Sequence, residues 1–543
     1  MKALISLKRI ITLCILFVSC STLSQAKVSL PKLISDGMVL QRNTPLLIWG
    51  SAEPGENIYI KFKKKKYETV ADANGKWRIN LPEMKAGGPY SMQINDIVLN
   101  DILIGDVYLC SGQSNMELPV NRVMDKFASE VNGYENNSIR YVKVPYSYDF
   151  SEKQDDVKTV SWKAMNKENF MGYSAICYFF SRIMQEKTGV PVGIINSSWG
   201  GTPVEAWISE EGLKDFPAYI NQKAMYEDNE LVALIKKMEN ERGNAWRNQL
   251  YRSDAGIHSD IPWYSEKLDD SEWEKIDMFS SEWASLNGRP INGTHWFRKD
   301  FDIPESWNIS DAVLRLGCIV DADSVFVNGH FVGSVSYQYP PRIYTVPSEL
   351  LKHGKNQITI RLFSNGGYPS FVQDKPYKLI CGDNEVDLTG IWKHKTGSVM
   401  PSAPSSTGFQ NVPVGLYNGM IFPLRNYKFK GIVWYQGESN VGRWNEYSSL
   451  LSAMIADWRK LFDSQLPFYI IELADFLAPD NPGRSAWAAL RKQQAITAEK
   501  NPDTYLIKNS DTGEWNDIHP LDKKTAAIRL VDTILNNDNK KHK

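Results

Sequence analysis

The α/β pattern of this chain is broken in the middle, and this constrains its fold more than any other feature. A short apolar strand over residues 106–110 leads through a loop to a helical pattern over 173–185 and a second strand over 190–195. Strand, loop, helix and strand in that order are typical of a parallel sheet covered by helices. The pattern stops near residue 257, so we predict an α/β domain whose first piece is residues 101–257.

The same pattern resumes after an insert and runs to the end of the chain. Apolar strand-like runs and amphipathic helical segments alternate there, and they occupy residues 431–435, 466–473, 485–500, 504–508 and 522–535. We therefore take residues 403–543 as the second piece of the same domain. Its unusual residues lie in loops that follow strands, which is where open α/β sheets place their active sites.

Two further regions have only short strand-like runs separated by turn residues. Residues 27–100 alternate such runs with Pro54-Gly55-Glu56 and Ala73-Asn74-Gly75, and residues 258–402 contain an Asn328-Gly329 turn and no long helix. Short strands at this spacing predict antiparallel β-sandwiches. We expect an N-terminal immunoglobulin-like sandwich and a second sandwich inserted into the α/β domain.

The first 26 residues have the features of a signal peptide. Lys2, Lys8 and Arg9 precede a short apolar run, and Ser24-Gln25-Ala26 offers a cleavage site of small residues. The alternative is a lipoprotein signal with Cys20 as the lipidated residue. No other stretch approaches the roughly 18 apolar residues that span a bilayer. We expect an exported protein that is periplasmic, secreted or surface-anchored.

Charge and cysteine usage exclude several classes of protein. The 62 basic and 63 acidic residues are balanced, which gives no electrostatic footprint for DNA or RNA. Four cysteines lie beyond the signal region, and none has the spacing of a metal site. Cys318 and Cys381 both fall in the insert, where a disulfide and two free thiols are equally open.

Two residues far apart in sequence could form a nucleophile and its base. Ser114 follows a strand in Gly112-Gln113-Ser114-Asn115-Met116, and the G-x-S-x-G pentapeptide of α/β-hydrolases is absent because residue 116 is Met. His519 precedes the last helix in Asp517-Ile518-His519-Pro520. A Ser hydroxyl needs an imidazole as base and an acceptor that orients this imidazole, so both loops are candidates for catalysis.

Two more loops could stabilise an oxyanion. Gly200 and Gly201 can present backbone N–H groups at close range, and Asn440 follows a strand and offers a side-chain amide. Together with the N–H of Ser114, these residues would supply three donors.

Four blocks in this order resemble those of the SGNH hydrolase superfamily, in the variant of sialate O-acetylesterases and related bacterial carbohydrate acetylesterases. They are Gly112-Gln113-Ser114-Asn115-Met116, Gly200-Gly201-Thr202-Pro203-Val204-Glu205-Ala206-Trp207, Trp434-Tyr435-Gln436-Gly437-Glu438-Ser439-Asn440 and Asp517-Ile518-His519-Pro520. The resemblance implies a flavodoxin-like three-layer α/β domain. The insert, through Trp296-Phe297-Arg298-Lys299 and residues 323–329, resembles a galactose-binding-like jelly roll that either binds glycan or shapes the rim of the active site.

Carried over residue by residue, the resemblance implies Ser114 as nucleophile, His519 as base, and Gly201 or Gly200 with Asn440 in the oxyanion hole. The superfamily places an Asp three residues before the His, where this chain has Asn516. Asp517 is therefore our candidate for orienting His519, and Asp511 is its rival. A Ser/His dyad assisted by a backbone carbonyl is the remaining scheme.

The sequence thus predicts an exported carbohydrate O-acetylesterase, with sialic acid as the first choice of sugar. Acetylated xylan, mannan or pectin and a non-catalytic glycan-binding protein are the alternatives, and the oligomeric state stays open. No cofactor and no metal are implied. The substrate-binding candidates are Gln113, Gln436, Glu438, Arg443 and Arg491, and either Arg could hold the carboxylate of sialic acid.

Overall fold

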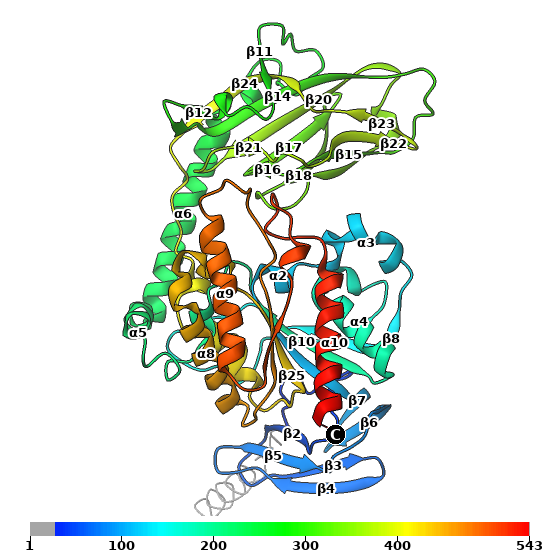
Figure 1. The fold of residues 1–543 in the computed structure, drawn as a ribbon, viewed down its shortest axis with the longest axis vertical. Coiled ribbons are helices and arrows are strands. Elements are labelled where there is room, and N and C mark those ends of the chain that lie inside the picture. The colour runs from blue at the N-terminus through cyan, green and yellow to red at the C-terminus, as the bar shows by residue number, and fades with distance from the viewer. Residues whose placement is uncertain (1–27, 542–543) are drawn as a thin grey trace, which may run out of the picture.

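A computed structural model describes residues 28–541 (Figure 1). The predicted signal peptide, including Cys20, lies outside the described residues. The described chain forms three stacked parts: a β module that contains the N-terminal strands, an α/β domain, and a β-rich insert at the other end. Within the described chain, the structure has no helix long and apolar enough to cross a membrane.

The α/β domain is built on one mostly parallel sheet. Numbered along the chain, its strands β7, β10, β25, β26 and β27 lie in the order 2-1-3-4-5, which is the flavodoxin-like order. The antiparallel strand β9 follows the parallel strand β8 at the edge beyond β10. The strands are β7 (Ile97–Gly112), β8 (Asn136–Lys143), β9 (Lys163–Met165), β10 (Val192–Ser198), β25 (Gly431–Tyr435), β26 (Phe468–Ile471) and β27 (Thr504–Ile507).

Helices cover this sheet as two packed pairs. The pair α4 (Ala175–Thr188) and α10 (Lys523–Lys541) lies to one side of the sheet, and the pair α8 (Trp444–Leu461) and α9 (Arg484–Lys500) lies to the other (Figure 1). Helix α4 begins where the Ser174 hydroxyl accepts the Cys177 N–H, and it ends at Gly189, whose φ of 68° suits glycine. Every residue of β10 and β25 is buried between these layers, as expected for a doubly covered parallel sheet.

Strand β7 joins the N-terminal module to the α/β domain. Its first half pairs with β6 (Gly87–Ile94), and its second half pairs with β10 and β25. The remaining strands of the module are β1 (Val39–Gln41), β2 (Leu46–Ser51), β3 (Asn57–Phe62), β4 (Lys65–Val70) and β5 (Lys76–Leu81). The strand predicted over 106–110 is therefore much longer, and the predicted boundary at residue 100 falls inside it.

Helix α6 (Asn229–Ser253) carries the chain toward the insert (Figure 1). The insert has a six-stranded and a four-stranded antiparallel sheet, and buried side chains from both sheets form one core, for example Phe297 and Ile360 with Leu314 and Leu379. The six-stranded sheet is β11 (Glu274–Asp277), β24 (Ile391–Met400), β14 (Asn292–Ile303), β20 (Gly354–Ser364), β17 (Ala322–Val327) and β18 (His330–Val335). The four-stranded sheet is β19 (Ile343–Val346), β15 (Ala312–Leu316), β22 (Tyr377–Cys381) and β23 (Asn384–Asp387).

The cysteines of the described chain, Cys110, Cys177, Cys318 and Cys381, are all buried free thiols. In the insert, the Cys381 thiol lies 3.4 Å from the Ser310 nitrogen, and the Cys318 thiol lies 3.6 Å from the Tyr339 carbonyl. Of the two alternatives for the insert, the structure shows free thiols.

Candidate active site

The four sequence blocks meet at one edge of the α/β sheet. Strands β7, β10 and β25 are parallel neighbours, so their carboxyl ends lie side by side. A cavity of about 810 Å³ opens at this edge, under the insert. Residues of blocks one to four that line it are Gln113, Ser114, Gly200, Gly201, Glu438, Ser439, Ile518 and His519, and Tyr337 and Tyr339 of the insert complete its wall.

Ser114 and His519 form a hydrogen-bonded pair in this cavity. Ser114 is the first residue of the short helix α2 (Ser114–Glu117), and its Oγ lies 2.8 Å from His519 Nε2. His519 lies in the loop between β27 and α10, so the fold brings together two residues 405 positions apart. This is the geometry that a hydroxyl nucleophile and its general base require.

Burial keeps the imidazole neutral. His519 is 7% exposed, and desolvation together with the positive charges of Lys523 and Arg122 lowers the pKa of His519 to about 3. A neutral imidazole has one N–H and one acceptor nitrogen. If Nε2 accepts the Ser114 hydroxyl proton, the ring proton is on Nδ1, and Nδ1 is buried with no acceptor among the described residues.

Asp517 does not touch the imidazole ring. Its Oδ1 accepts the backbone N–H of His519 at 2.8 Å, and burial raises the pKa of the Asp517 carboxyl. The rival candidate Asp511 does not bind the His519 ring either, because its exposed carboxylate is paired with Arg529 at 2.6 Å. The expectation that either carboxylate accepts a hydrogen bond from the ring is not met in this structure. A two-residue spacing lets Asp517 reach the backbone of His519 instead.

The insert holds the His519 loop in place. Lys375 Nζ lies 3.0 Å from Glu514 and 3.5 Å from Asp517, and the Asn516 amide donates to the Gln373 carbonyl at 2.8 Å. The pKa of Lys375 is raised because the charge of Asp517 and the hydrogen bond to Glu514 outweigh burial.

Tyr339 adds an aromatic contact from the insert. Its ring packs edge-to-face on the His519 imidazole with centroids 5.1 Å apart. Contacts from the insert therefore reach the His519 loop itself.

Of the two glycines, Gly201 has the free N–H. The Gly200 N–H donates to Glu117 Oε2 at 2.7 Å, whereas the Gly201 N–H donates to no described residue. Gly201 has a φ of +76°, where a side chain would be strained. The Ser114 N–H is equally available because the first residue of a helix has no intrahelical acceptor.

Asn440 and Gln436 lie behind the cavity wall and not on it. Both are fully buried. Asn440 Nδ2 donates to Glu205 at 2.9 Å, and its Oδ1 accepts from the Val204 N–H and from Gln436 Nε2. The predictions that Asn440 completes the oxyanion hole and that Gln436 binds substrate are therefore not supported. These amides join the block-two and block-three loops to each other.

Gln113 offers the side-chain amide that Asn440 does not. Its Oε1 accepts the N–H of Ser439 at 3.2 Å and the N–H of Gly437 at 3.5 Å, which fixes the orientation of the amide. Its Nε2 donates to no described residue, and the side chain lines the cavity beside Ser114. The amide donor of Gln113 is thus free for a ligand.

Of the remaining substrate-binding candidates, one lines the cavity and two do not. Glu438 lines the cavity, its Oε1 accepts from Asn115 at 2.5 Å, and burial raises the pKa of its carboxyl. Arg443 is paired with Glu205, and Arg491 lies 3.2 Å from Asp475. Neither Arg lines the cavity, so the structure gives no support to the prediction that one of them contacts substrate. Arg443 and Arg491 are held instead by the neighbouring carboxylates of Glu205 and Asp475.

Some cavity residues were missed by the sequence reasoning. Glu117 follows the block-one motif directly and binds Gly200 and Lys143, so its place in the motif was an available signal. Arg122 stands eight residues after Ser114, outside all four sequence blocks. Tyr337 and Tyr339 belong to the insert, and nothing in the sequence ties them to the α/β loops.

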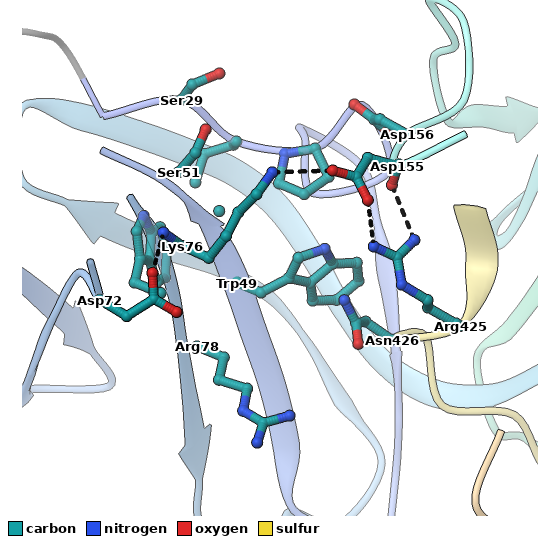
Figure 2. A pocket seen from close by; sticks show the side chains of 14 residues that line it. Ser29, Trp49, Ser51, Asp72, Lys76, Arg78, Asp155, Asp156, Arg425 and Asn426 are labelled. Carbon is teal, nitrogen blue, oxygen red and sulfur yellow. Dashed lines mark hydrogen bonds and ion pairs between the residues drawn. The ribbon is translucent and has the colours of Figure 1, made fainter. Parts of the chain in front are cut away.

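A second cavity of about 500 Å³ lies between the N-terminal module and the α/β domain (Figure 2). Asp155 bridges Lys76 of β5 at 3.1 Å and Arg425 at 2.7 Å, and Trp49 lies beside them. The described residues that line it include no His or Cys. Asp155 is thus matched by two cations, and the described lining offers no nucleophile with a base.

Comparison with known proteins shows the family of this chain. The family model described as "Carbohydrate esterase, sialic acid-specific acetylesterase" matches residues 104–268 and 398–531, together more than half of the chain. The chain belongs to this family. The two matched segments lie on either side of most of the insert and contain all four sequence blocks.

Individual members of this esterase family share a quarter to a third of their aligned residues with this chain. Sialate O-acetylesterase of Mus musculus is 24% identical over 92% of this chain and 71% of its own length. The Homo sapiens and Pongo abelii proteins of that name are 33% identical, but the match spans 33% of this chain and only 39% of each relative. A crystal structure of a carbohydrate acetylesterase from Xanthomonas citri covers 93% of this chain and 74% of its own at 24% identity, with a TM-score of 0.55, and this likeness supports the fold.

Proposed function

We propose that this member of the acetylesterase family removes O-acetyl groups from carbohydrates, with O-acetylated sialic acid as the substrate, and that Ser114 is the nucleophile. The observation that carries the proposal is the 2.8 Å hydrogen bond between Ser114 and a neutral, buried His519 inside a cavity of about 810 Å³. The family description and the names of the mammalian relatives support the acetyl ester and the sugar.

The first half of the reaction forms an acetyl-enzyme. Ser114 Oγ attacks the acetyl carbonyl carbon while His519 Nε2 takes the hydroxyl proton. The C–O bond to the sugar then breaks, and His519 returns the proton to the departing sugar oxygen. In the second half His519 takes a proton from water, the resulting hydroxide attacks the acetyl carbon, and Ser114 leaves with that proton as acetate is released.

The negative oxygen of each tetrahedral intermediate needs donors that are already in place. The N–H groups of Ser114 and Gly201 and the Nε2 of Gln113 have no acceptor in the described chain, and we assign the oxyanion to them. Gln113 thereby takes the role that the family resemblance implied for Asn440.

Asp517 and the insert act as positioning elements. Asp517 fixes the backbone of His519, Lys375 holds Asp517, and Tyr339 packs on the imidazole ring. The insert therefore shapes the rim of the site in this proposal, and this arrangement does not require it to bind glycan elsewhere.

The cellular location follows from the N-terminal sequence alone. We propose export through the signal peptide over residues 1–26, with lipidation of Cys20 as the alternative form of the same signal. An exported enzyme would meet acetylated glycans outside the cytoplasm.

Acetate release tests the proposal. The wild-type protein and Ser114→Ala are assayed side by side on O-acetylated sialic acid, acetylxylan, acetylmannan and a long-chain ester. The proposal expects release from the sialic acid substrate that Ser114→Ala abolishes. Preferred release from xylan or mannan would move the substrate to hemicellulose, and full activity of Ser114→Ala would overturn the mechanism.

A further inference from the structure

We propose that Arg122 is the residue of the catalytic cavity that binds the carboxylate of an acidic sugar. The inference rests on the proposed acetylesterase function and adds a specificity-determining residue to it. Arg122 ends the short 3₁₀ helix Val120–Arg122, which follows α2, and it lines the same cavity as Ser114 and His519. This segment is fixed because Val120 is buried and its N–H donates to the Tyr173 carbonyl at 2.8 Å.

Most N–H donors of the Arg122 guanidinium have no acceptor among the described residues. Nη2 donates to the Tyr339 carbonyl at 3.3 Å, whereas Nε is buried and has no acceptor among residues 28–541. Arg122 also forms no ion pair within that part of the chain. A guanidinium has five N–H donors in a planar fork, so most of its capacity is unused.

The other basic groups around the cavity already have side-chain acceptors. Lys143 donates to Glu117 at 2.9 Å, and Lys523 donates to the side-chain Oδ1 of Asn115 at 2.6 Å. Asp517 feels the charge of Arg122, but its carboxylate is occupied by the His519 N–H and Lys375. Arg122 is thus the cation of the described cavity lining that lacks an anionic partner.

A partly desolvated cation without a counter-ion is costly, and a ligand carboxylate removes this cost. A carboxylate also matches the guanidinium fork, because two parallel N–H···O bonds can form. The Tyr339 carbonyl holds one end of the guanidinium and thereby limits its rotation. The insert therefore orients the anion-binding group as well as the His519 loop.

Aromatic walls fit the body of a sugar beside this cation. Tyr337 and Tyr339 lie on one side with ring centroids 6.2 Å apart, and Tyr146 lines the cavity stacked on Trp199 at 4.3 Å. Such rings offer apolar faces with polar tips, which suits a pyranose. A sugar held by its carboxylate at Arg122 would be fixed at a second point when its acetyl group reaches Ser114.

The test compares O-acetylated sialic acid with its carboxyl methyl ester, which removes the charge and keeps the acetyl group. For the wild type we expect kcat/KM to favour the free acid by about 10- to 100-fold, as for a hydrogen bond to a charged group. Arg122→Gln should erase this preference by lowering kcat/KM for the acid alone, and Arg122→Lys should retain part of it. Arg247→Gln, the same change on an exposed residue of α6, is the matched control.

Each outcome has a distinct meaning. A wild type that hydrolyses acid and methyl ester equally well, or a folded Arg122→Gln protein that loses both activities in parallel, would overturn the role of Arg122 and leave the esterase intact. A wild type that releases acetate from neither substrate would overturn the proposed function and this inference with it. If Arg122→Gln misfolds, the wild-type preference and its partial retention in Arg122→Lys remain the test.

Discussion

The carboxylate of Asp517 accepts the backbone N–H of His519 at 2.8 Å and leaves the imidazole Nδ1 of that residue without an acceptor in the described chain. His519, the proposed base, is thus held through its backbone, by the ring of Tyr339 and by Ser114, and not by a carboxylate on its ring. This arrangement differs from a Ser-His-Asp triad and makes different predictions.

Asp517→Asn should be a mild variant. In a triad, replacing the Asp by Asn traps the wrong imidazole tautomer and costs about 10⁴-fold in kcat. Here the Asn oxygen can still accept the His519 N–H, so we expect a loss of about tenfold in kcat. Steady-state kinetics on an acetyl ester measure this, and a loss near 10⁴-fold would show that Asp517 does bind the ring during catalysis.

Lys375→Met tests whether the insert supports the catalytic loop. The variant leaves the largely buried Asp517 without its cation, so we expect a lower kcat and weakened docking of residues 514–519. Lys378→Met is the matched control, because Lys378 pairs with Glu385 on the exposed surface of the same insert. Hydrogen exchange of the 514–519 segment should rise in Lys375→Met only. Equal behaviour of the two variants would refute the support role.

The pH profile reports the buried base. Since the pKa of His519 is lowered to about 3, the base is unprotonated down to low pH, and the acid limb of kcat/KM should lie well below pH 6.5. The unfolded chain protonates this His near pH 6.5, so its contribution to folding free energy turns unfavourable as the pH falls from 6.5 toward 3. Assays at each pH need a return to neutral pH as a control for unfolding. An acid limb near 6.5 would contradict the buried neutral imidazole.

Substitution of Gln113 should lower kcat, whereas substitution of Asn440 should lower the stability of the fold. Gln113→Glu keeps an oxygen for the N–H groups of Gly437 and Ser439 but removes the amide donor, and loss of one oxyanion donor costs about 10²- to 10³-fold in kcat. Asn440→Ala removes the partner of the buried Glu205 Oε2 and of the Val204 N–H, which costs about 1–3 kcal/mol of folding free energy. Thermal unfolding separates the two, since only Asn440→Ala should melt early. If Asn440→Ala is stable and its kcat falls as far as that of Gln113→Glu, Asn440 and not only Gln113 donates to the oxyanion.

The sequence was sufficient for the parts that depend on chain order. The central strands and helices follow from apolar periodicity, and parallel strands bring Ser114 and His519 to one edge. Helix α9 (Arg484–Lys500) was predicted over 485–500. The length of β7 was missed because one strand serves two domains, and its pattern changes from half-exposed to fully buried at Ile102.

The partners of the side chains could not be predicted in this way. Asn440 has the type and place of an oxyanion donor, but Glu205 and Gln436 bind its amide in the fold. Arg443 looked like a free cation until Glu205 was placed beside it. The roles of Lys375, Tyr339 and Arg122 depend on how the insert docks, and no local pattern encodes docking.

The most direct test of the central claim is the site of acetylation during turnover. The enzyme is mixed with a chromogenic acetyl ester, quenched in acid within the first turnovers, digested and analysed by peptide mass spectrometry. The account predicts one acetyl group on Ser114 and none on the Ser114→Ala protein treated in the same way. An acetyl group on a different residue of a working enzyme, or sustained turnover by Ser114→Ala, would contradict it.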